Sequence, residues 1–155
     1  MKMKRSQLLW IYAVTAGVFF LLDLVWIGVV AKDFYAGTIG GLLRDSVNWP
    51  AALIFYFLYI GGIVLFVLVP AIRANTSIRS TAGMGGLLGL FAYGTFDLTA
   101  LALLEGWPVI VTAVDMAWGA TLTGGAAGGS LWIARNFLKT DGWPGGRNQK
   151  ENNDG

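Results

Sequence analysis

Three aspartates, Asp23, Asp97 and Asp115, lie inside long apolar stretches of the chain. No Lys or Arg lies inside these stretches to neutralise their charge. An Asp at the centre of a membrane-spanning helix costs about 2.5 to 3.5 kcal/mol on insertion scales, which the fold must offset through mutual contacts, water or a bound ligand. These residues are therefore the first candidates for binding protons or a ligand.

Two of the aspartates are followed three residues later by a tryptophan, Trp26 after Asp23 and Trp118 after Asp115. On a helix this spacing places the carboxyl group and the indole on one face. Together they offer a negative charge, an N–H donor and a ring face that attracts cations, which favours a site for a cation or an amine. The alternative is that the two indoles only fill space in the core.

Tyr93 lies four residues before Asp97, so a helix would put both side chains on one face, where the tyrosine can hydrogen-bond Asp97 or a ligand. Thr99 is a weaker candidate, because membrane threonines often bond to their own backbone. The predicted ligand- and proton-binding residues are Asp23, Asp97, Asp115, Trp26, Trp118 and Tyr93.

The apolar stretches at 8–31, 51–69, 81–104 and 109–134 are each long enough to cross a bilayer, which needs about 20 residues. With 55% hydrophobic and 13% charged residues, the sequence predicts an all-α integral membrane protein, a four-helix transmembrane bundle. Residues 1–134 form its single domain, and we expect 135–155 to be a disordered cytoplasmic tail. The first stretch could also be a signal peptide, but it is longer than such segments and contains Asp23.

The Lys and Arg residues predict that both termini are cytoplasmic, because cytoplasmic segments carry the excess of positive charge. On the predicted outer side lie only Lys32 and Arg44, whereas the predicted inner side carries Lys2, Lys4, Arg5, Arg73, Arg79, Arg135, Lys139, Arg147 and Lys150. We expect segment 32–50, with Phe34, Tyr35 and Trp49, to be an outer connection that either caps the site or lies on the membrane surface, or is a plain connector.

The predicted depths of the three aspartates are similar. Counting residues from Lys32, Glu105 and Pro108 as outer boundaries gives roughly 13, 12 and 10 Å for Asp23, Asp97 and Asp115 at 1.5 Å per residue. The three carboxyl groups are then expected at nearly one level. Carboxylates that share such a site do not all ionise, so a proton or a cation is expected there. A protonated Asp that only bridges two helices is the structural alternative.

Glycines at spacing four predict close packing of the last two helices, which the short connection 105–108 makes antiparallel neighbours. The pairs are Gly85 with Gly89, Gly124 with Gly128 and Gly125 with Gly129. A homodimer through glycine-rich faces and Asp23 is a further option that the sequence leaves open.

The chain has no Cys and no His, which excludes disulfides, thiolate and imidazole chemistry, haem ligation and the usual zinc sites. Any metal would have to be a hard cation bound by oxygens. We predict no metal and no cofactor. The basic residues form no face or run, so we expect no nucleic acid partner; the lipid bilayer and a small cationic solute are the expected partners.

Five segments together resemble the domain of unknown function 2177 family of small bacterial membrane proteins, over about residues 8–134. They are 22–26 (LDLVW), 48–52 (NWPAA), 93–99 (YGTFDLT), 106–108 (GWP) and 115–119 (DMAWG). The chain departs from the family pattern at Ala100 and Leu101, where an Asn is frequent. The resemblance implies a four-helix protein of the bacterial inner membrane and implies no activity.

Three classes of function fit these observations. The first, which we favour, is a proton-linked protein that binds or transports a small cation or amine. The second is a membrane-embedded enzyme acting on a lipid or isoprenoid with an Asp pair as acid and base; no phosphate-binding motif or nucleophile with a partner base supports it, so an enzyme is not expected. The third is a structural or accessory subunit whose aspartates lock helices together.

Overall fold

The computed structural model describes residues 3–137, and every regular element in this range is helical. Four helices are long and apolar enough to cross a membrane. They span Arg5–Leu42, Trp49–Arg73, Ile78–Leu103 and Val109–Phe137. The predicted all-α transmembrane bundle is therefore confirmed. The last helix runs to Phe137, past its predicted end at Ala134, and the rest of the predicted tail lies outside the described residues.

The first crossing is longer than predicted. It consists of α1 (Arg5–Trp26), the π-helical segment η1 (Ile27–Ala31), α2 (Lys32–Ile39) and the 3₁₀ turn η2 (Gly40–Leu42). The prediction that the helix ends at Ala31 and that a loop begins at Lys32 is wrong. Lys32 ends the apolar run without ending the helix, because a lysine is a good helix former whose long side chain reaches the polar region.

The second crossing comprises α3 (Trp49–Gly62), the π-helical segment η3 (Ile63–Leu68) and α4 (Val69–Arg73). The Asn48 side chain caps its start by accepting the Ala51 N–H at 3.3 Å. Pro70 lacks an N–H and its ring crowds the preceding turn, which explains why that turn widens into η3. The other crossings are single helices, α5 (Ile78–Leu103) and α6 (Val109–Phe137).

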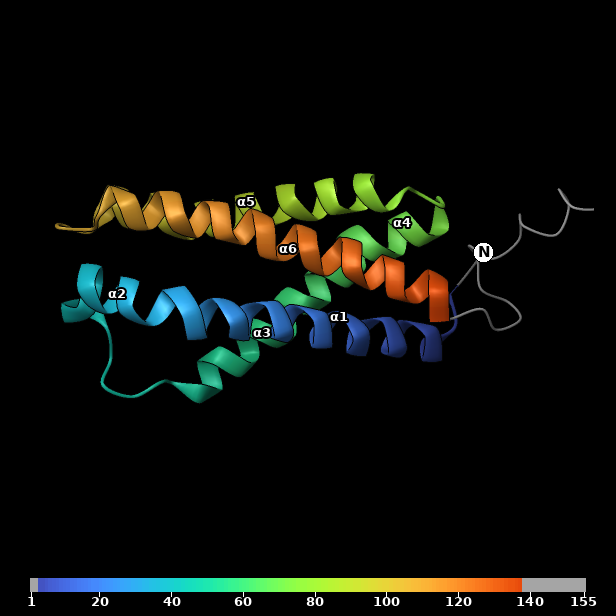
Figure 1. The fold of residues 1–155 in the computed structure, drawn as a ribbon, viewed down its shortest axis with the longest axis horizontal. Helices are drawn as coiled ribbons and strands as arrows, with labels where there is room; N and C mark the ends of the chain where they lie inside the picture. The colour runs from blue at the N-terminus through green and yellow to red at the C-terminus, as the bar shows by residue number, and fades with distance from the viewer. Residues whose placement is uncertain (1–2, 138–155) are drawn as a thin grey trace, which may run out of the picture.

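Figure 1 shows α5 and α6 side by side and antiparallel, with α1 packed along α6 and α2 continuing the direction of α1. The second crossing runs diagonally, with α3 near α1 and η3 in contact with α5 and α6. Both ends of the described chain lie at the same end of the bundle, and the apolar core fills the half nearer to them. Buried members of this core include Ile11, Phe19, Ile63, Leu68, Leu122 and Leu131.

Glycines bring α5 and α6 into backbone contact. A Cβ on Gly85 would lie 2.7 Å from the Ala127 Cβ, and one on Gly89 would collide with the Gly119 carbonyl group. Gly125 and Gly129 instead face α1, where they meet Leu22 and Val18. The predicted glycine packing therefore holds α5 against α6, while the last pair holds α1 against α6.

We predict that Gly89→Ala destabilises the protein by about 1–3 kcal/mol, because the backbone of Gly119 leaves no room for a methyl group. The matched control is Gly83→Ala on the same helix, where an added Cβ meets nothing within 4 Å. Thermal unfolding in detergent should show a lower midpoint for Gly89→Ala alone. Equal midpoints for the two variants would contradict the backbone contact.

Candidate ligand-binding site

A cavity of about 690 Å³ lies between the first crossing, α3 and the α5–α6 pair. Its size is in the range of small-molecule sites, and its walls are mostly apolar and aromatic with a few polar groups, as is usual for such sites. The lining residues are Asp23, Trp26, Ile27, Ala31, Lys32, Tyr35, Ala36, Ile39, Leu43, Val47, Phe55, Tyr56, Tyr93, Asp115 and Trp118.

Each of the two aspartates in the cavity wall accepts a hydrogen bond from a tyrosine. Tyr56 on α3 donates to Asp23 Oδ2 at 2.9 Å, and Tyr35 on α2 donates to Asp115 Oδ1. Asp23 is only 8% exposed. Both bonds join different crossings, so each carboxyl group also fixes the position of a neighbouring helix.

The two tryptophans stack on each other, with ring centroids 4.4 Å apart and planes 9° from parallel. The Trp118 indole lies beside the Asp23 carboxyl group, while its buried Nε1 has no hydrogen-bond partner among residues 3–137. The Trp26 indole lies beside the Tyr35 hydroxyl group. Because one face of each ring covers the other ring, only the outer faces and the edges remain for a ligand.

Asp97 lies behind the cavity wall and is 1% exposed. Its carboxyl group adjoins that of Asp115 on the next helix, and its Oδ1 has no hydrogen-bond partner in the described part of the chain. Thr112 donates to the Asp97 backbone carbonyl at 3.4 Å. Asp97 is thus in contact with the cavity only through Asp115.

The predicted hydrogen bond from Tyr93 to Asp97 is wrong. The Tyr93 ring packs against Gly119 and lies edge-on to Tyr59 at 6.2 Å, and its hydroxyl group makes no hydrogen bond within residues 3–137. Gly119 on α6 has no side chain, and the Tyr93 ring fills the space over it instead of turning toward Asp97. Tyr93 lines the cavity instead.

The aspartates do not share one level. Added Cβ atoms at Gly125 and Gly129 would lie 3.2 Å from Leu22 and 3.3 Å from Val18, which fixes the register of α1 against α6. In this register Asp23 is level with about residue 124, roughly 13 Å along the axis from Asp115 at 1.5 Å per residue. Asp97 and Asp115 stay together, and Asp23 lies deeper because its helix does not end at Lys32.

Sequence reasoning missed two residues of the site, Tyr35 and Tyr56. Tyr35 follows Asp23 by twelve positions, which in a regular helix places the two about 120° apart. The π-helical turn η1 accommodates an extra residue and rotates α2 by roughly 100°, which brings Tyr35 to the Asp23 side. Gly28 within η1 is the single sequence signal for this irregularity. Tyr56 carries no comparable signal, since it depends on how α3 is placed.

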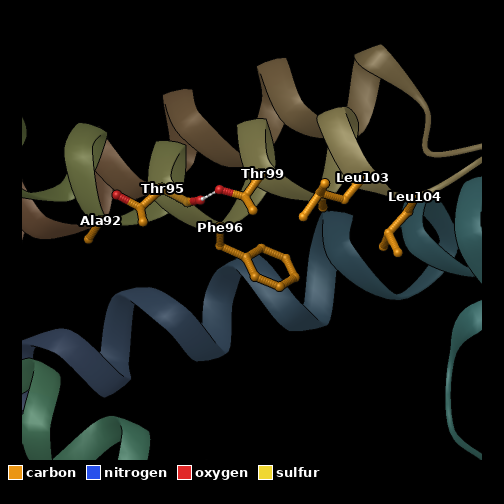
Figure 2. Close-up of a pocket in the computed structure, with 7 residues that line it drawn as sticks. Ala92, Thr95, Phe96, Thr99, Leu103 and Leu104 are labelled. Atoms are coloured by element: carbon orange, nitrogen blue, oxygen red, sulfur yellow. Dashed lines mark hydrogen bonds between the residues drawn. The ribbon is translucent and has the colours of Figure 1, made fainter.

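A second cavity, of about 550 Å³, lies along α5 (Figure 2). Its lining residues belong to that one helix, except Leu104, which directly follows it. The hydroxyl groups of Thr95 and Thr99 donate to the carbonyl groups of Phe91 and Thr95, so they satisfy their own backbone, and Figure 2 shows the second of these bonds. This surface offers no free polar group and is an apolar groove on the outside of the bundle.

Four apolar crossings around a cavity lined by the buried Asp23 and the half-buried Asp115 define a polytopic helical membrane protein. Residues 8–132 match the family described as "Predicted membrane protein (DUF2177)", and the chain belongs to this family. No curated protein and no solved structure matches the chain.

We predict that the double variant Val18→Cys/Gly129→Cys forms a disulfide on mild oxidation, because a Cβ added at Gly129 would lie 3.3 Å from Val18 Cγ1, an atom at the γ position that a cysteine sulfur also occupies. The chain has no native cysteine, so the result is unambiguous. Formation of the disulfide is measured as the loss of cysteine labelling by a maleimide after oxidation. The control Val18→Cys/Ser130→Cys, shifted by one residue, should remain labelled; equal labelling of both would overturn the register of α1 against α6.

Proposed function

We propose that the protein binds a small organic amine in this cavity and that binding displaces a proton. The observation that carries the proposal is the position of Asp23 and Asp115 in the wall of one aromatic cavity, where both accept hydrogen bonds from neutral tyrosines. Tyrosine hydroxyl groups orient a carboxylate without cancelling its charge. In apolar surroundings a proton or an ammonium group cancels that charge, and the Lys32 that lines the cavity is itself exposed.

Competition between these two occupants couples amine binding to proton release. Both bind the same carboxyl oxygens, so an ammonium group that binds Asp115 displaces a proton held there. Asp97 offers a second position for the displaced proton. It adjoins Asp115, is buried and has an oxygen without a hydrogen-bond partner in the described chain. Asp115 is thus the proposed ligand-binding group and Asp97 the proposed proton acceptor behind it.

We further propose a multi-pass protein of the bacterial inner membrane with both termini in the cytoplasm, supported by the excess of Lys and Arg at that end. In this orientation the cavity lies in the outer half, near Lys32, and the apolar core fills the inner half. The amine would therefore enter from outside. Translocation would require a second state in which the core around Phe19 and Leu122 opens.

A purely structural role for the aspartates is the second candidate, favoured by the way the two Asp–Tyr bonds join separate crossings. It predicts that removing a carboxylate destabilises the fold and that no amine binds. The two candidates therefore differ in a ligand-binding measurement.

The test is proton release from purified protein in weakly buffered detergent on addition of a primary alkylamine. We expect release by the wild type and its loss in Asp115→Asn. Asp33→Asn, which removes an exposed carboxylate outside the cavity, should release protons as the wild type does. Absence of binding and release by the wild type, together with unfolding of Asp115→Asn, would establish the structural role instead.

Lys32 also lines the cavity and is exposed, so its positive charge opposes the entry of an amine. We predict that Lys32→Gln tightens amine binding about two- to fivefold at low ionic strength, and less at high salt. Isothermal titration measures the change. Arg44→Gln, a charge removal on the same side but outside the cavity wall, should leave the affinity within experimental scatter. An equal gain in both variants would mean that only net charge matters.

A further inference from the structure

We propose that the natural ligand is a dication, two ammonium groups joined by an apolar chain, with one end bound to Asp23 and the other to Asp115. This inference rests on the proposed function and goes beyond it, because a single charged group would explain one acidic residue in the cavity but not two that lie apart.

The two carboxyl groups are independent acceptors. They lie roughly 13 Å apart along the helix axes by the register of α1 against α6. Each belongs to its own hydrogen-bonded pair, Asp23 with Tyr56 and Asp115 with Tyr35. In each pair one carboxyl oxygen accepts the tyrosine. The Trp118 indole lies beside Asp23 and the Asp97 carboxyl group lies beside Asp115, but Trp118 Nε1 and Asp97 Oδ1 complete no hydrogen bond within residues 3–137. Both ends of the cavity therefore retain an acceptor for an ammonium group.

The wall between the two acceptors is apolar. The stacked indoles of Trp26 and Trp118 lie there, and their outer faces and edges border the same cavity as both carboxyl groups. Methylene groups pack favourably against such rings. Along the cavity a carboxylate is followed by an aromatic wall and then by a second carboxylate. This order is complementary to a ligand that has an ammonium group at each end of a methylene chain.

The geometry also sets a length. Each ammonium nitrogen binds a carboxylate oxygen at about 2.8 Å, which leaves roughly 8 Å between the two nitrogens. The distance grows to roughly 11 Å because Asp side chains on antiparallel helices lean apart. An extended alkyl chain advances about 1.25 Å per bond, so the expected ligands have about five to eight methylene groups. A cavity of about 690 Å³ has room for such a molecule.

The test is the affinity of the full chain in detergent for unbranched α,ω-diamines of rising length, each compared with the monoamine of equal carbon number. We expect diamines with about five to eight methylenes to bind at least tenfold more tightly than their monoamines, since a second charge-assisted contact adds about 1.5 kcal/mol or more. Diamines with two or three methylenes should show no such advantage.

Two variants at Asp23 sharpen the test. Asp23→Asn should abolish the diamine advantage, so that each diamine binds no more tightly than the monoamine of equal carbon number, because only Asp115 then remains to bind an ammonium group. Asp23→Glu extends the acceptor by one methylene and should shift the best diamine to a chain shorter by about one methylene, which no merely structural role predicts. If Asp23→Asn does not fold, the length profile of the wild type and the Asp23→Glu shift still decide the matter.

The outcomes separate this inference from the proposed function. Monoamines that bind with proton release, while no diamine binds better than its monoamine, would overturn the dication and leave the proposed function intact. Absence of binding by every monoamine and diamine would overturn both.

Discussion

The constraint on which this structure depends is that ionisable carboxyl groups lie inside apolar membrane-spanning helices, with Lys32 as the one basic residue among those that line the cavity. A membrane-buried Asp needs polar neighbours, and here they come from the aromatic residues of other helices. Tyr56 donates a hydrogen bond to Asp23 and Tyr35 donates one to Asp115. The Trp118 indole lies beside Asp23, and the Trp26 indole lies beside Tyr35. The cavity is therefore bounded by the same contacts that hold the crossings together.

The bundle combines a tightly packed part with a less regular one. The α5–α6 pair is close-packed through Gly85, Gly89 and Gly119, where no side chain fits between the backbones. The first and second crossings each contain a π-helical segment, η1 and η3, and each supplies a tyrosine to the cavity. Asp97 and Asp115 thus belong to the closely packed hairpin, while the groups opposite them belong to helices whose geometry departs from a regular α-helix.

Much of this architecture follows from the sequence, because apolar length fixes the number of crossings and the unpaired Asp residues identify the polar positions. The rotation of each helix about its axis and the depth of each residue in the bundle do not follow from the sequence. The charge of Lys32 was mistaken for a helix end, which placed Asp23 too near the surface and Tyr35 in a loop. Spacing of four residues predicts that Tyr93 reaches Asp97, whereas the space left by Gly119 on the neighbouring helix takes up the Tyr93 ring. Tyr56 depends on tertiary placement, which spacing within one helix does not encode.

The stacked indoles have one further consequence. Trp26 and Trp118 each follow an Asp by three residues on helices that run in opposite directions, so the two Asp–Trp motifs are inverted relative to each other where their indoles stack. The inverted pair of motifs, taken alone, does not distinguish inward from outward. Any preferred direction must come from features outside this pair, namely Asp97, which adjoins Asp115 alone, and the apolar core, which lies at one end only.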